Sequence, residues 1–286
     1  MKKKIPKKVW ISALVITVIA LSVWAAWGTT ALELNACCIE SAVIPKAFSG
    51  YRIAHVSDLH NAQMGKENER LIAMLKDARP DIIAITGDLI DSRRTDVQIA
   101  LDFAKQALEI APCYYVTGNH EARVPEYQDL KMGLQELGVT VLEDQRILLE
   151  KEGEHITLLG VNDPSFQTNY LLGDSVSVME QALQQLTNEE KGYTVLLSHR
   201  PELFEVYVES GVDLVLSGHA HGGQFRLPFL GGMAAPNQGL FPKYDAGLYS
   251  EQECTMVVSR GIGNSLVPFR FNNRPEVVLI ELQKAE

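Results

Sequence analysis

The chain has 286 residues, of which 46% are apolar and 22% are charged. This length holds one large domain or two small ones, and the composition excludes a wholly disordered protein. The formal net charge is −10, but five of the 26 basic residues are lysines within the first eight positions. The remainder carries 21 basic against 36 acidic side chains, a net charge of −15, so no nucleic acid partner is expected.

The first predicted element is an apolar helix. Residues 9–27 contain no charge, and this length at about 1.5 Å per residue matches a bilayer core of roughly 30 Å. Trp10 lies at one end and Trp24 and Trp27 at the other, where aromatic rings favour the membrane interface. The basic residues 1–8 predict a cytoplasmic amino terminus, with the rest of the chain outside the cytoplasm. A cleaved signal peptide is the alternative, and it also exports the domain.

Residues 30–286 are predicted to form a single domain, because no repeat, low-complexity linker or second change in composition follows the apolar segment. Short β-rich runs alternate with helical periodicities. The predicted strands are residues 51–56, 82–85, 113–116, 155–161, 194–197, 214–216, 256–258 and 277–280. The predicted helices are residues 67–78, 97–108 and 175–186. This alternation favours an α/β layered fold, with helices outside a central sheet or pair of sheets.

Five of these strands end in residues that can bind a metal. They are Asp58 with His60, Asp88, Asn119, His199, and His219 with His221. Each one alone has an ordinary explanation as a helix cap, a turn residue or a hydrogen-bonded histidine. These ordinary explanations would have to apply separately at the ends of five strands, so a shared role in metal binding is the simpler interpretation. A carboxylate can bridge two cations while imidazole and amide groups complete their shells, so the sequence predicts a two-metal site.

The same residues resemble the blocks of the calcineurin-like metallophosphoesterase family. In order, the blocks stand here as Asp58-Leu59-His60, Gly87-Asp88-Leu89-Ile90, Gly118-Asn119-His120-Glu121, His199 and Gly218-His219-Ala220-His221. The resemblance covers about residues 51–223. Three later segments are similar to membrane-associated bacterial phosphodiesterases, a subgroup with relatives that act on UDP-2,3-diacylglucosamine. These segments are His221-Gly222-Gly223-Gln224, Gly261-Ile262-Gly263 and Pro268-Phe269-Arg270.

The resemblance also implies a role for each residue. The implied ligands of the first metal are Asp58, His60, Asp88 and His221. Asp88 would bridge to a second metal, whose other implied ligands are Asn119, His199 and His219. His120 matches the family's catalytic histidine, which stabilises charge on the phosphoryl oxygens or protonates the leaving alkoxide. All of these donors are nitrogen or oxygen, which favours Mn, Fe or Zn without choosing among them.

Several other residues are candidates for a functional role, and each has a structural role as its alternative. Glu121 is a candidate to orient His120, or a plain acid at a helix start. The candidate phosphate contacts are Arg123, Arg200, Arg226 and Arg270, each with a structural ion pair as its alternative. Four cysteines lack the C-x-x-C spacing and are predicted to be buried thiols, although a disulfide stays open. They are Cys37, Cys38, Cys113 and Cys254.

The leading functional hypothesis is hydrolysis of a phosphodiester or pyrophosphate by a metal-bridging hydroxide. The predicted anchor favours an envelope or lipid-linked substrate. One alternative is a phosphomonoesterase or phosphoprotein phosphatase with the same site. A non-catalytic, membrane-tethered binding module is disfavoured, because all seven implied ligands and His120 are present. The oligomeric state stays open.

Overall fold

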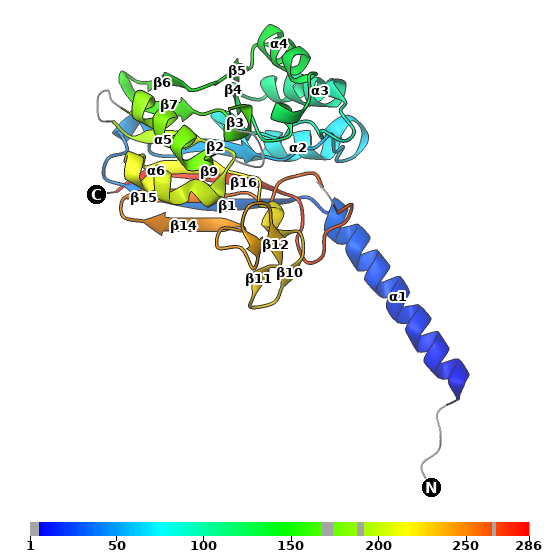
Figure 1. Cartoon of the computed structure of the whole chain (residues 1–286). Helices are drawn as coiled ribbons and strands as arrows, with labels where there is room; N and C mark the ends of the chain where they lie inside the picture. Colours follow the sequence, from blue (N-terminus) through cyan, green and yellow to red (C-terminus); the bar gives the residue numbers. More distant parts are fainter. Residues whose placement is uncertain (1–5, 168–173, 188–191, 265–266, 286) are drawn as a thin grey trace.

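The computed structural model describes residues 6–167, 174–187, 192–264 and 267–285 (Figure 1). Two six-stranded sheets dominate these described residues. The first sheet has the order β1 (Glu33–Ser41), β16 (Glu276–Lys284), β2 (Tyr51–Val56), β3 (Ile82–Thr86), β4 (Cys113–Val116) and β5 (Thr140–Val141). The second has the order β14 (Gly247–Glu251), β15 (Cys254–Val258), β9 (Leu214–Ser217), β8 (Thr194–Leu197), β7 (Glu154–Gly160) and β6 (Gln145–Lys151).

The sheets pack face to face, with helices on both outer surfaces. Apolar side chains of both sheets share one core, among them Ile53, Val195 and Ile280. The outer face of the first sheet packs against α2 (Glu69–Ala78), α3 (Val97–Leu108) and α4 (Tyr127–Leu137). That of the second packs against α5 (Ser175–Leu186) and α6 (Phe204–Ser210). Central strands such as β3 are buried on both faces, which explains their continuous apolar sequences.

Parallel pairing places the functional loops at common edges. Strands β2, β3 and β4 are parallel neighbours, as are β7, β8, β9 and β15. Short elements complete the description. They are the 3-10 helices η1 (Lys46–Phe48), η2 (Lys66–Asn68), η3 (Glu121–Arg123), η4 (Pro164–Phe166), η5 (Pro201–Leu203) and η6 (His221–Gly223), and the strands β10 (Arg226–Leu227), β11 (Gly231–Gly232), β12 (Ala234–Ala235) and β13 (Gly239–Leu240).

The predicted layered α/β fold is confirmed, and each predicted strand and helix is present. The first predicted helix starts later than expected, at Glu69, because Glu67 and Asn68 adopt left-handed conformations with φ of 52° and 62°. The sequence analysis did not predict α4, α6, β5, β6 or β14. Helix α6 has only seven residues, and four of them are buried, so its sequence lacks the alternation of an amphipathic helix.

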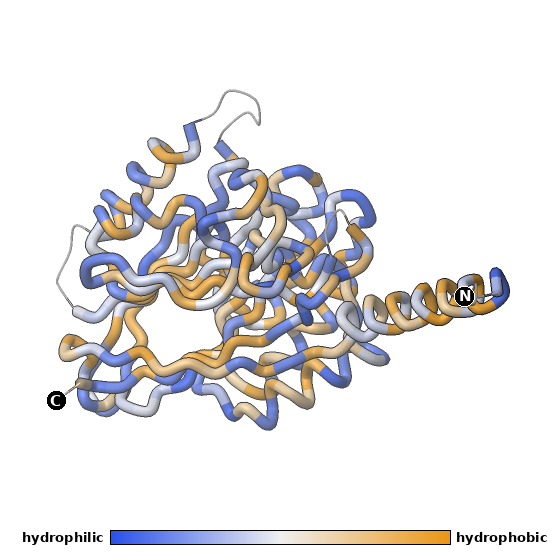
Figure 2. The backbone as a smooth tube through the Cα atoms, turned by 90° about the horizontal axis from the view of Figure 1, so that it is seen from below, coloured by the Kyte–Doolittle hydropathy of each residue, from blue (hydrophilic) through white to orange (hydrophobic). Residues whose placement is uncertain are grey.

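The amino-terminal helix α1 (Lys7–Thr30) stands away from the sheets (Figures 1 and 2). Within the described part of the chain it is the one helix long and apolar enough to cross a membrane. Residues 6–24 are all exposed, including Leu14 and Ile16. Exposing such a side chain to water costs about 1.5 kcal/mol or more, so α1 needs an apolar environment. The basic residues 2–4 lie outside the described residues.

The carboxyl end of α1 is fixed to the domain. The Thr29 hydroxyl oxygen accepts a hydrogen bond from the backbone N–H of Arg270 at 3.0 Å. The Arg274 guanidinium lies 4.9 Å from the centre of the Trp27 ring, and Arg70 donates to the carbonyl of Thr30 at 2.6 Å. These contacts give α1 a defined direction relative to the sheets.

All four cysteines are free thiols. Burial is confirmed for Cys113 and Cys254, and Cys37 is half-buried. The prediction is wrong for Cys38, which is exposed. Its strand, β1, is an edge strand whose side chains are mostly in contact with solvent.

Candidate metal centre

The loops that follow strands of both sheets meet at one place. Within the first sheet, the backbone N–H of Asp58 donates to the carbonyl of Gly87 at 3.1 Å. Between the sheets, Nδ1 of His199 donates to the carbonyl of Thr86 at 2.7 Å. The backbone N–H of His219 also lies 3.1 Å from Oδ2 of Asp58. The polar residues at the ends of β2, β3, β8 and β9 therefore converge, as expected for parallel strands.

Asp88 lies at the middle of this cluster and is buried. Its Oδ2 is 3.5 Å from Nε2 of His60 on one side and 3.2 Å from Nε2 of His199 on the other. Its Oδ1 accepts a hydrogen bond from the backbone N–H of His120 at 2.8 Å. The neighbouring imidazoles hold the pKa of Asp88 well below its usual range despite burial, so it is a carboxylate.

Two groups of possible metal ligands lie on either side of Asp88. In the first, Nε2 of His60 and Nε2 of His221 are 3.1 Å apart, and Oδ1 of Asp58 is 3.7 Å and 3.3 Å from them. In the second, Asp88 is grouped with His199 and His219, where Nε2 of His199 lies 3.2 Å from Nδ1 of His219. All of these residues are buried.

The donor atoms fit a bound cation. Because Nδ1 of His199 donates to a carbonyl, its Nε2 presents a lone pair to the Asp88 carboxylate in the neutral ring. Burial alone would lower the pKa of His199, but the Asp88 carboxylate outweighs burial and raises it to about 10. The carboxylate of Asp88 therefore stabilises a positive charge at Nε2 of His199, either a proton or a bound cation. Oδ1 of Asn119 is also buried and finds no hydrogen-bonding partner among the described residues.

His120 is held in one tautomer. The backbone N–H of Ser92 donates to its Nδ1 at 2.9 Å, so the neutral ring carries its proton on Nε2. That nitrogen lies 4.0 Å from Oδ2 of Asp88 and faces the cluster. Burial lowers the pKa of His120 to about 4. At neutral pH the ring is therefore an uncharged hydrogen-bond donor beside Asp88.

Glu121 binds the main chain of the site loops. Its carboxylate accepts backbone N–H bonds from Asp88 at 2.9 Å, from Gly118 at 2.8 Å and from Ile90 at 3.2 Å. It begins η3, as the second sequence interpretation held, but it is fully buried. Burial raises its pKa to about 7. Glu121 therefore joins the loops after β3 and β4, rather than bonding to the His120 ring.

Two of the candidate phosphate contacts, Arg200 and Arg270, are used in structural bonds. Arg200 is buried and donates to Asp163 through Nε and Nη2 at 2.5 and 2.8 Å, and its Nη1 lies 3.3 Å from Nε2 of His219. Arg270 is buried and donates to the backbone carbonyls of Arg260 and Gly263. Arg200 therefore supports a candidate ligand rather than facing solvent.

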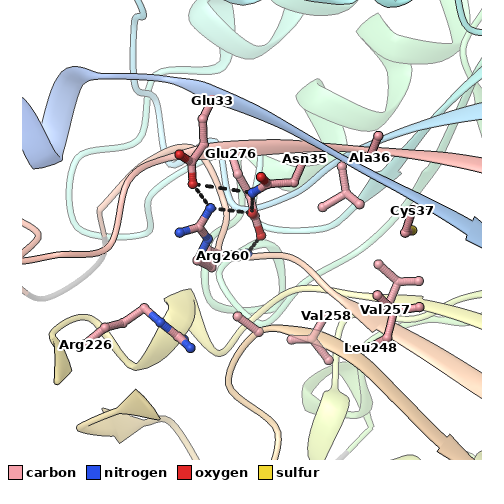
Figure 3. Close-up of a pocket in the computed structure, with 13 residues that line it drawn as sticks. Glu33, Asn35, Ala36, Cys37, Arg226, Leu248, Val257, Val258, Arg260 and Glu276 are labelled. Carbon is pink, nitrogen blue, oxygen red and sulfur yellow. Dashed lines mark hydrogen bonds and ion pairs between the residues drawn. The ribbon is translucent and has the colours of Figure 1, made fainter. Parts of the chain in front are cut away.

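Arg226 lies in a different cavity, away from the cluster around Asp88. It pairs with Asp245 at 3.0 Å and lines a separate cavity of about 380 Å³ between the sheet edges (Figure 3). On the other side of that cavity Arg260 is paired with Glu33 and Glu276. The remaining candidate, Arg123, is exposed in η3.

A cavity of about 510 Å³ opens beside the cluster, within the usual size range for small-molecule sites. Its lining residues are His60, Asn61, Ala62, Asp91, Arg93, Arg94, Asn264 and Pro268. Asp91 forms a third possible ligand group with His60 and His120. The sequence analysis did not identify Asp91, Ser92, Arg93 or Arg94, although they directly follow the Asp88 block.

Asp163 was also missed. It follows β7, a parallel neighbour of β8, so the rule that selected polar residues after strands applies to it as well. Its carboxylate is buried and pairs with Arg200. Residues 155–161 were predicted as a strand, but no residue after that strand was among the predicted site residues.

Comparison with known proteins identifies the family to which the chain belongs. The profile of the calcineurin-like phosphoesterase family matches residues 51–223, a segment that contains every block described above. The chain belongs to this family, and it is a phosphoric ester hydrolase. Members of the family use divalent metal ions, in agreement with the acidic and histidine clusters.

Individual relatives agree with that assignment. The uncharacterized metallophosphoesterase YkoQ of Bacillus subtilis (strain 168) is 29% identical over 234 residues, 80% of this chain and 83% of YkoQ. The phosphodiesterase YaeI of Escherichia coli (strain K12) is 29% identical over 237 residues, 81% and 82% of the two chains. A transmembrane protein with metallophosphoesterase domain from Danio rerio is 30% identical over 85% of this chain and 55% of its own length.

Among solved structures, TT1561 of Thermus thermophilus superposes with a TM-score of 0.52 at 14% identity. The match covers 75% of this chain and 91% of TT1561. This likeness supports the fold alone.

Proposed function

We propose that this chain is a membrane-anchored, two-metal phosphodiesterase that acts on an envelope or lipid-linked substrate. One observation carries the two-metal part of the proposal. Oδ2 of Asp88 lies between His60 and His199, within 3.5 Å of a ring nitrogen on each side. A carboxylate oxygen placed between two imidazole groups is suited to bridge two cations.

The proposed ligand sets follow the two groups around Asp88. The ligands of the first ion are Asp58, His60, Asp88 and His221. Those of the second are Asp88, Asn119, His199 and His219. A pair of ions in such a site neutralises the phosphoryl oxygens and activates water for attack. The donors are nitrogen and oxygen only, and they fit Mn, Fe or Zn.

The protein itself supplies orientation and a hydrogen-bond donor. His120 presents its Nε2–H toward the cluster, where it hydrogen-bonds a phosphoryl oxygen or the leaving oxygen of the substrate. Glu121 fixes the loops that carry Asp88 and Asn119. Arg200 positions the ring of His219.

Membrane anchoring by α1 is part of the proposal. Residues 30–286 form the catalytic domain, outside the cytoplasm, and the five lysines within residues 2–8 stay inside. The contacts of Trp27 and Thr29 with Arg274 and Arg270 favour a retained anchor, because cleavage at residues 29–31 would remove them. The relative from Danio rerio is itself described as a transmembrane protein.

The test is to replace the bridging carboxylate in the full chain. Asp88→Ala removes it, and Asp88→Asn keeps its shape. We expect about two metal ions per wild-type chain by mass spectrometry, and at least about 100-fold slower hydrolysis of bis-p-nitrophenyl phosphate in both variants. The exposed residue Asp77 on α2 provides the control, Asp77→Ala.

The same assay with p-nitrophenyl phosphate compares diester and monoester substrates. The proposal requires the diester to be hydrolysed with the higher kcat/KM. Undiminished activity of Asp88→Asn would reject the proposed metal centre, and a preference for the monoester would assign the site to a phosphomonoesterase.

A further inference from the structure

The segment that follows η6 exposes several large apolar side chains. Phe229 and Leu230 lie between β10 and β11, and Leu240 and Phe241 lie at the end of β13. Phe229 is fully exposed, and the other three are 58–73% exposed. With Phe269, which is also exposed, these residues are called the apolar tip surface below. Single exposed apolar residues are common, but several on one short segment favour an interaction site.

Two residues of this surface adopt left-handed backbone conformations. Phe229 and Phe241 have φ of 69° and 53°. A non-glycine residue in this region costs about 1 kcal/mol or more. Neither ring is buried within the chain, so intramolecular packing does not offset that cost.

The apolar tip surface is connected to the end of α1. The rings of Phe225 and Phe269 lie 5.4 Å apart, and the backbone N–H of Arg226 donates to the carbonyl of Phe271 at 3.0 Å. The intervening residue, Arg270, holds Thr29 of α1. Figure 1 shows β10, β11 and β12 projecting from the domain on the side toward which α1 runs.

The charge of this region differs from that of the rest of the domain. Residues 225–246 contain a single acidic residue, Asp245, together with Arg226 and Lys243. Asp245 is buried and paired with Arg226, so it presents no exposed negative charge. The chain beyond the first eight residues carries a net charge of −15. The apolar tip surface is therefore the part of an acidic domain that an anionic membrane surface would not repel.

The same segment borders the metal centre. Asn237, between β12 and β13, donates to Glu202 at 2.8 Å and lies 3.5 Å from Nε2 of His219. On another side, Pro268 lines the cavity that opens at His60, and Phe269 follows it in the chain. The apolar tip surface therefore flanks the entrance to the cluster.

We infer that the apolar tip surface docks into the headgroup region of the same bilayer that α1 spans, so that the metal centre faces phosphodiesters of membrane lipids. The inference rests on the proposed anchor and narrows the substrate to bilayer-embedded lipids. Interfacial side chains of this kind lie about 5–10 Å below the headgroup boundary. Phe229, Leu230, Leu240 and Phe241 supply that apolar contact.

The experiment measures the depth of one side chain in a reconstituted full chain. All three native tryptophans lie in α1, so they are first replaced by phenylalanine. Phe229→Trp is then introduced and the protein is placed in phosphatidylglycerol–phosphatidylcholine vesicles with brominated acyl chains. We expect about twofold quenching of its fluorescence by lipids brominated near the headgroup, where interfacial side chains lie.

The matched control is Met132→Trp in the same background. Met132 is 54% exposed on α4, which lies far from β10–β12 in Figure 1. Its fluorescence should not be quenched. Thermal unfolding midpoints equal to that of the parent would show that both variants are folded.

Three results would overturn the inference. Absence of quenching at Phe229→Trp, with the native tryptophans of α1 quenched in the parent, would reject the docking surface and leave the anchor and the enzyme intact. Unquenched but blue-shifted fluorescence would assign the surface to contact with a second copy of this chain, because no other protein is present in the vesicles. Unquenched native tryptophans would reject the anchor as well, while the rate with bis-p-nitrophenyl phosphate reports independently on the metal centre.

Discussion

A backbone donor decides what His120 can do. The N–H of Ser92 cannot accept a proton, so Nδ1 of His120 must be the acceptor of that bond. Protonation of Nδ1 would break the bond, and burial separately lowers the pKa of the ring. At neutral pH the imidazole can therefore donate from Nε2 but cannot act there as a base.

This tautomer leads to a prediction about leaving groups. His120→Ala should lower kcat/KM for an alkyl phosphodiester by about 100-fold or more, because the Nε2–H of the neutral ring stabilises the negative charge that develops on the alkoxide oxygen. With p-nitrophenolate as the leaving group, the loss should be much smaller. His120→Gln keeps an N–H donor, so its kcat/KM for the alkyl phosphodiester should lie between those of the wild type and His120→Ala. The measurement is kcat/KM against leaving-group pKa for each variant.

The control for that series is His155→Gln, since His155 is exposed at the start of β7. Equal losses in His120→Ala for good and poor leaving groups would contradict hydrogen bonding to the leaving oxygen. They would limit His120 to hydrogen bonding of the phosphoryl oxygens.

At the scale of elements, the site depends on close contact between loops of neighbouring strands. A Cβ on Gly118, after β4, would lie 2.3 Å from Oδ1 of Asp88, after β3. One on Gly218, after β9, would lie 2.3 Å from Oδ2 of Asp58, after β2. Only glycine allows these loops to approach, which explains why it precedes Asn119 and His219 in the sequence.

Gly118→Ala should therefore displace Asp88 and weaken the metal centre without unfolding the sheets. We expect a fall in bound metal and about 100-fold slower diester hydrolysis, because a shift of about 1 Å at a reacting centre has that effect. Metal analysis, rates and the thermal unfolding midpoint measure the result.

Gly192→Ala serves as its control, since the nearest atom to the added Cβ would be Nε2 of His155 at 4.0 Å. Normal metal content in Gly118→Ala would show that the loops after β3 and β4 can separate without loss of the site.

At the scale of the whole molecule, the direction of α1 decides where catalysis takes place. The helix has no charge between residues 9 and 27, and its end is bonded to the domain through Arg270 and Arg70. With α1 as the proposed membrane anchor, the domain is expected to lie next to the membrane surface, and the lysines within residues 2–8 predict on which side.

A reporter fused after residue 286 tests this topology. Alkaline phosphatase, which folds only outside the cytoplasm, should be active in bacterial cells, and a green fluorescent protein fusion should be dark. Replacing the five amino-terminal lysines by glutamine removes the positive charge and should lower the alkaline phosphatase activity. A fluorescent fusion with inactive phosphatase would place the domain in the cytoplasm instead.

The sequence by itself determined the layered α/β class, the apolar helix and the candidate residues of the site. These features are local: Asp58, Asp88 and His199 each follow a short apolar strand, and parallel strands bring such positions to one edge. Short elements such as α6 left no periodic signal, because most of their side chains are buried.

Only the tertiary structure decided what each polar residue contacts. Pairing of Arg200 with Asp163, the Ser92 bond to His120 and the position of Asp88 between His60 and His199 join residues far apart in the chain. The closeness of the apolar tip surface to α1 is likewise a property of packing. Such contacts depend on how two sheets and their loops come together in space, which residue spacing along the chain does not record.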